Sequence, residues 1–86
     1  MNLMNDVLQV LDAALGLQGR ALGFHRETPL LGALPELDSM AVLALITGLE
    51  NQFDLSFSDE ELSARCFTSV GSLCELVQQT LAAQHP

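Results

Sequence analysis

The chain has 86 residues, too few for more than one hydrophobic core, so we expect a single domain spanning residues 1–86. Apolar residues make up 49% of it, which is enough for a compact core, and eleven acidic side chains against three arginines give a net charge of −8. Nucleic acid and anionic lipid repel such a charge, so both are excluded as partners, and any electrostatically guided partner should be basic.

The first predicted element is a helix over residues 3–16. Its apolar residues recur at spacings of three and four: Met4, Val7, Leu8, Leu11, Ala14 and Leu15. Gly16 and Gly19 then supply a helix-ending signal. Because the segment has no basic region and reaches Asp6 and Asp12 before any long apolar run, we expect neither a signal peptide nor a membrane span, and a cytoplasmic protein.

A long loop is expected next, up to Leu37, because glycine and proline are too dense for a regular element of any length. These breakers are Gly19, Gly23, Pro29, Gly32 and Pro35. A loop of about twenty residues is uncommon in a compact domain unless it serves a function. Its apolar residues predict that it is held down onto the core: Leu30, Leu31, Leu34 and Leu37.

Three further helices are expected. The second spans 39–53, where Asp38 or Ser39 is the capping type of residue and a buried stripe keeps the helical period: Val42, Leu43, Ile46, Leu49 and Phe53. Ser58 followed by three acids predicts a short helix near 59–65, and Thr68 or Ser69 starts the last helix, 69–83. No segment alternates like a strand. The sequence therefore predicts an all-α protein, a small four-helix bundle with three longer helices, one short helix and a long loop between the first two.

The chain offers few groups for catalysis or metal binding. A nucleophilic serine needs a base held by a third group, and the only histidines are His25 in the loop and His85 near the end. The acids at 59–61 point in different directions on a helix, so helix N-terminal charge explains them better than a metal does. Cys66 and Cys74 form no CxxC pair and are expected to be small apolar residues, with a redox switch as the alternative. We predict no metal and no catalytic residue.

The segment LPELDSMAV, residues 34–42, places Ser39 directly after the long loop and at the start of the most apolar helix. Taken alone, Ser39 has a plain structural interpretation as the cap of that helix. A phosphate attached to it, however, would face the positive end of the helix. The position therefore suits a phosphodiester.

The pattern resembles the acyl and peptidyl carrier proteins, small acidic four-helix bundles modified on the serine of an Asp-Ser-Leu or Asp-Ser-Met motif. Asp38, Ser39 and Met40 match that motif. FDLSFSDEEL at 53–62 resembles the family's next loop and short helix, and FTSVGSLCELV at 67–77 resembles the entry to its last helix. The resemblance covers essentially all of the chain. The segment between Gly32 and Asp38 is longer than the common form and is similar to that of a free-standing carrier associated with exosortase-type surface-polysaccharide gene clusters.

The resemblance implies that Ser39 carries 4′-phosphopantetheine donated by coenzyme A, flanked by Asp38 and Met40. It implies a monomeric, non-catalytic carrier that holds an acyl or aminoacyl group as a thioester. The implied partners are a phosphopantetheinyl transferase, an acyl-loading ligase or acyltransferase, and acyl-accepting enzymes. One departure concerns docking: Glu50 is the only acid of the second helix, where fatty-acid carriers display several, so docking to standard fatty-acid enzymes is not implied.

Two alternatives stay open at this point. A set of apolar residues either lines a crevice for the cargo or is ordinary core: Leu45, Ile46, Leu49, Leu62 and Val70. The rival function is an unmodified helical interaction module, in which the apolar Met40 face docks a partner and Ser39 only caps the second helix. A small hydrolase using Ser39 and His25 lacks an orienting group. In both leading interpretations Met40 is a partner contact, because the buried stripe is complete without it.

Overall fold

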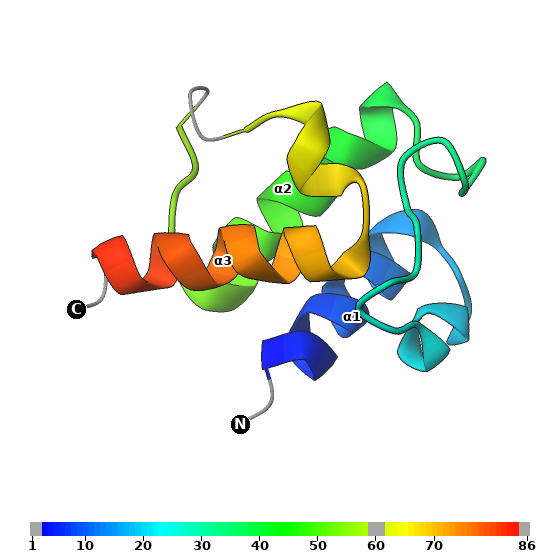
Figure 1. Ribbon diagram of the computed structural model, residues 1–86, viewed down its shortest axis with the longest axis horizontal. Helices are drawn as coiled ribbons and strands as arrows, with labels where there is room; N and C mark the ends of the chain where they lie inside the picture. The colour runs from blue at the N-terminus through cyan, green and yellow to red at the C-terminus, as the bar shows by residue number, and fades with distance from the viewer. Residues whose placement is uncertain (1–2, 59–61, 85–86) are drawn as a thin grey trace.

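The computed structural model describes residues 3–58 and 62–84, and within these ranges the chain is helical (Figure 1). The three α-helices of this part are α1 at Leu3–Leu15, α2 at Ser39–Phe53 and α3 at Val70–Gln84. Two short 3₁₀-helices accompany them, η1 at Arg20–Gly23 and η2 at Ala64–Phe67. Extended pairing in the described ranges is limited to one isolated bridge between Pro29 and Ser69. The expected small all-α bundle is therefore confirmed.

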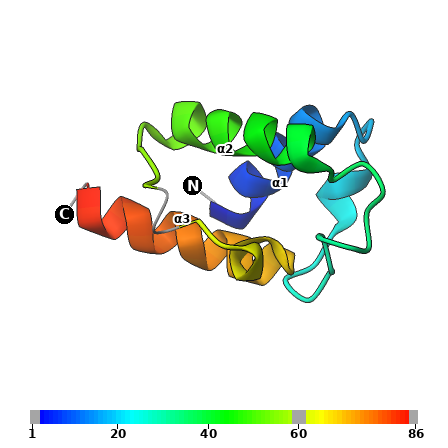
Figure 2. The ribbon, with the colours of Figure 1, turned by 90° about the horizontal axis from the view of Figure 1, so that it is seen from above.

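Helix α1 is central, because it packs against both α2 and α3. Figure 2 shows α2 and α3 running along opposite sides of the molecule, with α1 between them. α1 and α2 approach closely at Gly48, where a Cβ atom would lie 2.9 Å from Val10 Cγ1. The core consists of leucine and valine from all three helices, joined by apolar residues of the loops: Leu17, Ala21, Leu30, Leu37, Leu55 and Phe67.

The two helices that frame the long loop end in the same way. After α1, Gly16 adopts a left-handed conformation with φ of 63°, and the N–H of Leu17 donates to the Asp12 carbonyl at 3.1 Å. After α2, Asp54 takes the left-handed position with φ of 53°, and the N–H of Leu55 returns to a carbonyl of the last turn. Leu17 and Leu55 are both buried, so each cap also adds a leucine to the core.

The long loop is tied to the junction between η2 and α3 by backbone hydrogen bonds. The N–H groups of Leu30 and Leu31 donate to the carbonyls of Thr68 and Phe67, each at 2.9 Å. The N–H of Gly71 donates to a loop carbonyl, that of Arg26, at 2.7 Å. The loop is therefore part of the packed fold, as its leucines predicted.

One of the four loop leucines was placed wrongly by the sequence. Leu30 and Leu37 are buried and Leu34 packs against the core, but Leu31 is 42% exposed. The reason is the close turn at Leu30, whose carbonyl accepts the N–H of Leu34 at 2.9 Å. Because of this turn, the adjacent side chains of Leu30 and Leu31 cannot both reach the core, and only Leu30 does.

The two short elements differ from expectation. Residues 59–61 of the predicted short helix at 59–65 lie outside the described residues, Leu62 and Ser63 are not helical, and the short helix present is η2 at Ala64–Phe67. The loop, expected to hold no regular element, contains η1. There the Asp12 carboxylate accepts the N–H groups of Gly19 at 2.8 Å and Ala21 at 3.2 Å. This contact satisfies donors at the start of η1, and nothing in the local pattern announces it.

Both cysteines are free thiols. Cys74 is buried in α3, and this burial raises the pKa of its thiol. Cys66 is half-buried in η2, with its sulfur 3.7 Å from the hydroxyl oxygen of Ser63. Cys74 therefore behaves as the small apolar core residue that the sequence predicts.

Candidate attachment site at the start of α2

Ser39 is the first residue of α2, and its side chain is exposed. The residue that caps the helix is Asp38: its backbone is extended, and its Oδ1 accepts the N–H of Ala41 at 2.8 Å. The interpretation in which Ser39 only caps the helix is therefore wrong, because the neighbouring carboxylate occupies that role. The Ser39 hydroxyl is left facing solvent.

The start of α2 suits a phosphate on that hydroxyl. The N–H groups of Ser39 and Met40 belong to the first turn, where a helix has no internal acceptors for its donors. They add to the positive end of the helix dipole, which stabilises an anion nearby. The first turn of the 15-residue helix also holds no acidic residue. The residues present therefore fit a serine-linked phosphodiester.

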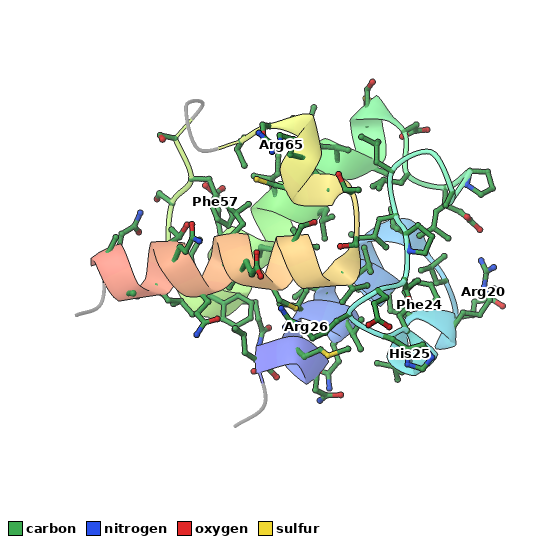
Figure 3. The ribbon with its side chains drawn as sticks, viewed as in Figure 1. Arg20, Phe24, His25, Arg26, Phe57 and Arg65 are labelled. Atoms are coloured by element: carbon green, nitrogen blue, oxygen red, sulfur yellow. The ribbon has the colours of Figure 1, made fainter. Side chains whose placement is uncertain are left out.

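The segment just before Ser39 is held in place by the burial of Leu37 and by an ion pair of Glu36. Leu37 is buried, and its N–H donates to the Leu34 carbonyl at 3.1 Å. Arg20 of η1 donates from Nη2 to Oε2 of Glu36 at 2.6 Å, and this hydrogen bond is the main reason that the pKa of Glu36 is below its ordinary value. Figure 3 shows Arg20 at the edge of the molecule beside η1. The sequence did not predict this ion pair, because no local spacing links residues on opposite sides of a long loop.

Two large apolar side chains flank the serine on the surface. Met40 is 76% exposed and Leu43 is 61% exposed. The expectation that Met40 lies outside the core is confirmed, whereas the inclusion of Leu43 in the buried stripe is wrong. Leu43 lies two residues before the fully buried Leu45, which corresponds to about 200° around a helix, so the burial of one exposes the other.

The residues considered for a cargo crevice lie mostly in the interior. Leu45, Leu49 and Val70 are completely buried, while Ile46 and Leu62 are half-buried against the same cluster. Three of the five therefore have no exposed surface with which to line an open crevice. Their burial therefore favours the interpretation that these residues are ordinary core and do not line a crevice.

The other candidate chemistries find little support in the described residues. His25 is exposed in the loop (Figure 3), where its backbone N–H donates to Thr28 Oγ1 at 2.7 Å. Within residues 3–58 and 62–84, no group of three or more side chains could hold a metal ion. The acids at 59–61 lie outside these ranges. None of the helices in the described part is long and apolar enough to cross a bilayer.

Of the comparisons of this chain with known proteins, the one with solved structures gives a match. No protein-family model matches the chain, and no curated protein sequence matches it. A solved structure that does match is the holo acyl carrier protein of Nitrosomonas europaea, determined in solution by NMR, with a TM-score of 0.88 and 41% identity. The alignment covers 95% of this chain and 99% of that one. At this identity over nearly the full length of both, the chain belongs to the acyl carrier protein family.

Proposed function

We propose that Ser39 carries 4′-phosphopantetheine and that the protein transports an acyl or aminoacyl group as a thioester on that arm. The observation that carries the proposal is the exposed hydroxyl at the first position of α2, beside a capping aspartate that leaves it free. Family membership supports the cofactor, since the similar structure is that of a holo acyl carrier protein. When bound, the cofactor supplies the thiol that holds the cargo.

Each residue of the motif has a distinct role in this proposal. Ser39 supplies the oxygen through which the arm is attached. Asp38 fixes the start of α2, so that the hydroxyl is presented at a defined place. The first-turn N–H groups of Ser39 and Met40 stabilise the negative charge of the phosphodiester. The chain itself performs no chemical step, and it is the substrate of a transferase.

The partners follow from this role. A phosphopantetheinyl transferase uses coenzyme A to modify Ser39, an acyl-loading ligase or acyltransferase charges the thiol, and acyl-accepting enzymes unload it. We place the protein in the cytoplasm, where coenzyme A is available, and regard residues 1–86 as one monomeric carrier domain. The long segment between Gly32 and Asp38 supports the exosortase-associated type of free-standing carrier.

The test is the intact mass of the purified protein after incubation with coenzyme A and a broad-specificity phosphopantetheinyl transferase. The wild-type protein should gain one phosphopantetheine, and Ser39→Ala should gain none. Ser56→Ala, which removes another exposed serine, is the matched control and should gain one. A wild-type protein that stays unmodified would refute the proposal and favour the interaction module, which needs no modification.

A further inference from the structure

Arg20 of η1 is held at two atoms of its side chain. Its Nε donates to the Leu17 carbonyl at 3.2 Å, and its Nη2 donates to Glu36 Oε2 at 2.6 Å. η1 is in turn held to α1, because the Asp12 carboxylate accepts the N–H groups of the two residues on either side of Arg20. The guanidinium therefore has a defined position relative to the central helix.

The carboxylate of Glu36 depends on this arginine. Its Oε2 is the atom that Arg20 contacts, whereas its Oε1 is shielded from solvent and has no hydrogen-bond partner in the described part of the chain. A buried carboxylate oxygen without a partner is costly, so we expect the Glu36 side chain to leave its place when the arginine is removed. The ion pair therefore holds Glu36 where it is.

Glu36 is also linked through the backbone to the start of α2. Its carbonyl accepts the N–H of Asp38 at 3.1 Å, and Asp38 Oδ1 accepts the N–H of Ala41 at 2.8 Å. Ser39 lies between these two hydrogen-bonded residues. A continuous series of contacts therefore connects Arg20, near one end of the long loop, with the first turn of α2 at its other end.

We propose that Arg20 and Glu36 are positioning residues for the modification of Ser39. The inference rests on the proposed function. The ion pair keeps the segment before α2 in the conformation that presents the Ser39 hydroxyl to the phosphopantetheinyl transferase. Without the pair, this segment also adopts conformations that do not present the hydroxyl, and the apparent affinity of the transferase for the protein falls in proportion to the competent fraction. The two side chains act through Asp38 and not on the reacting hydroxyl.

The main experiment measures the steady-state modification of two arginine variants, with coenzyme A and a broad-specificity transferase as the probe. Arg20→Ala should raise the KM for the carrier protein about fivefold, the upper limit for a surface ion pair, and leave kcat unchanged. Arg26→Ala is the matched control, because Arg26 forms an exposed pair with Glu75 of α3 at 3.6 Å and its replacement removes the same charge. It should keep the wild-type KM. Equal KM values for Arg20→Ala and the wild-type protein would overturn the proposal.

A double variant tests whether the two residues act through each other. Glu36→Ala should raise KM as Arg20→Ala does, and Arg20→Ala/Glu36→Ala should have the same KM as either single variant, because the pair can be lost only once. Both single variants leave kcat at the wild-type value. Effects on KM that multiply in the double variant would show two independent contributions and would overturn the proposed pairing.

Amide hydrogen exchange of the unmodified protein tests the positioning without the transferase. In Arg20→Ala, the N–H groups of Asp38 and Ala41 should exchange about fivefold faster, while those in the middle of α3 keep the wild-type rate. Equal acceleration in all three helices would show a loss of global stability and would overturn the positioning role. Failure of the wild-type protein to be modified at all would refute the proposed function itself, whatever the exchange rates, so the two failures are distinguishable.

Discussion

Asp38 and Ser39 are adjacent, yet their side chains have different surroundings. The Asp38 carboxylate accepts a backbone N–H of α2 and holds the helix start, while the Ser39 hydroxyl is exposed one residue later. In sequence, either residue could be the cap, because serine and aspartate are comparably good at that position. Only the backbone conformation distinguishes them: Asp38 is extended, and Ser39 is already helical.

Mutations should separate the capping role of Asp38 from the role of the exposed Ser39. Asp38→Ala should lower the free energy of unfolding by about 0.5–2 kcal/mol, the usual cost of losing a capping side chain, and Asp38→Asn should restore most of it. Ser39→Ala should change stability by less than about 0.5 kcal/mol, because the side chain is exposed and alanine favours helix. Urea denaturation measures all three variants. A greater loss for Ser39→Ala than for Asp38→Ala would show that the serine is the structural residue.

Met40 should contribute to recognition and little to stability. Because its side chain is largely exposed, Met40→Ala leaves no cavity and should change the melting temperature little, while it slows modification of Ser39. Leu45→Ala, at a fully buried position of the same helix, should cost about 2–5 kcal/mol. Thermal melts and labelling rates test both variants. A large fall in melting temperature for Met40→Ala, with normal labelling of the folded protein, would contradict this assignment.

At the scale of the helices, the contact between α1 and α2 depends on the absence of a side chain at Gly48. A Cβ there would overlap Val10 Cγ1, and a valine in a helix cannot readily rotate its methyl groups aside. Val10 and Gly48 also line a groove between the two helices. One glycine therefore sets the distance between the helix that carries Ser39 and the central helix.

Gly48→Ala should accordingly be destabilising. Overpacking costs about 1–3 kcal/mol, and the better helix propensity of alanine returns at most about 1 kcal/mol. In a Val10→Ala background the clash disappears, so the same substitution should be neutral or stabilising. A double-mutant cycle by chemical denaturation measures this coupling. Additive effects of the two substitutions would show that the helices relax apart without cost.

The sequence predicted the long elements well and the short ones poorly. α2 matches its predicted range because Pro35 and Asp38 exclude an earlier start and the apolar period persists to Phe53. Of the short helix predicted near 59–65, residues 59–61 lie outside the described residues, Leu62 and Ser63 are not helical, and η2 begins at Ala64 and extends past the predicted end. Short 3₁₀ turns depend on distant partners, as η1 depends on the carboxylate of Asp12, and such partners have no local pattern.

At the scale of the whole molecule, the long loop connects the proposed attachment site to the rest of the fold. Its middle part, residues 26–31, is bonded to the junction between η2 and α3, and its last part is held to η1 by the pair of Arg20 and Glu36. The motif around Ser39 could be recognised from the sequence, because it is contiguous. Of the two exposed apolar side chains beside it, Met40 was predicted from the sequence and Leu43 was not, since the exposure of Leu43 depends on which face of α2 meets α1.

The ion pair predicts a pH dependence. Because the pKa of Glu36 is lowered in the folded protein, its contribution to stability is present above the ordinary glutamate pKa of about 4.5 and is lost as the pH falls through the lower folded value. Glu36→Gln should therefore be less stable than the wild-type protein at neutral pH and converge with it in acid. Glu27→Gln, at an exposed position of the same loop, is the control. A constant difference at all pH values would contradict an ionic contribution.

The most direct test of the account is to locate the modification within the labelled protein. Trypsin should cleave after Arg26 and Arg65 and release a peptide of residues 27–65, which contains Ser39, Ser56, Ser58 and Ser63. Tandem mass spectrometry of this peptide should place one phosphopantetheine on fragments that include Ser39 and on none that include only the later serines. An addition on any other serine, or no addition to the wild-type protein, would contradict the assignment of Ser39 as the attachment site.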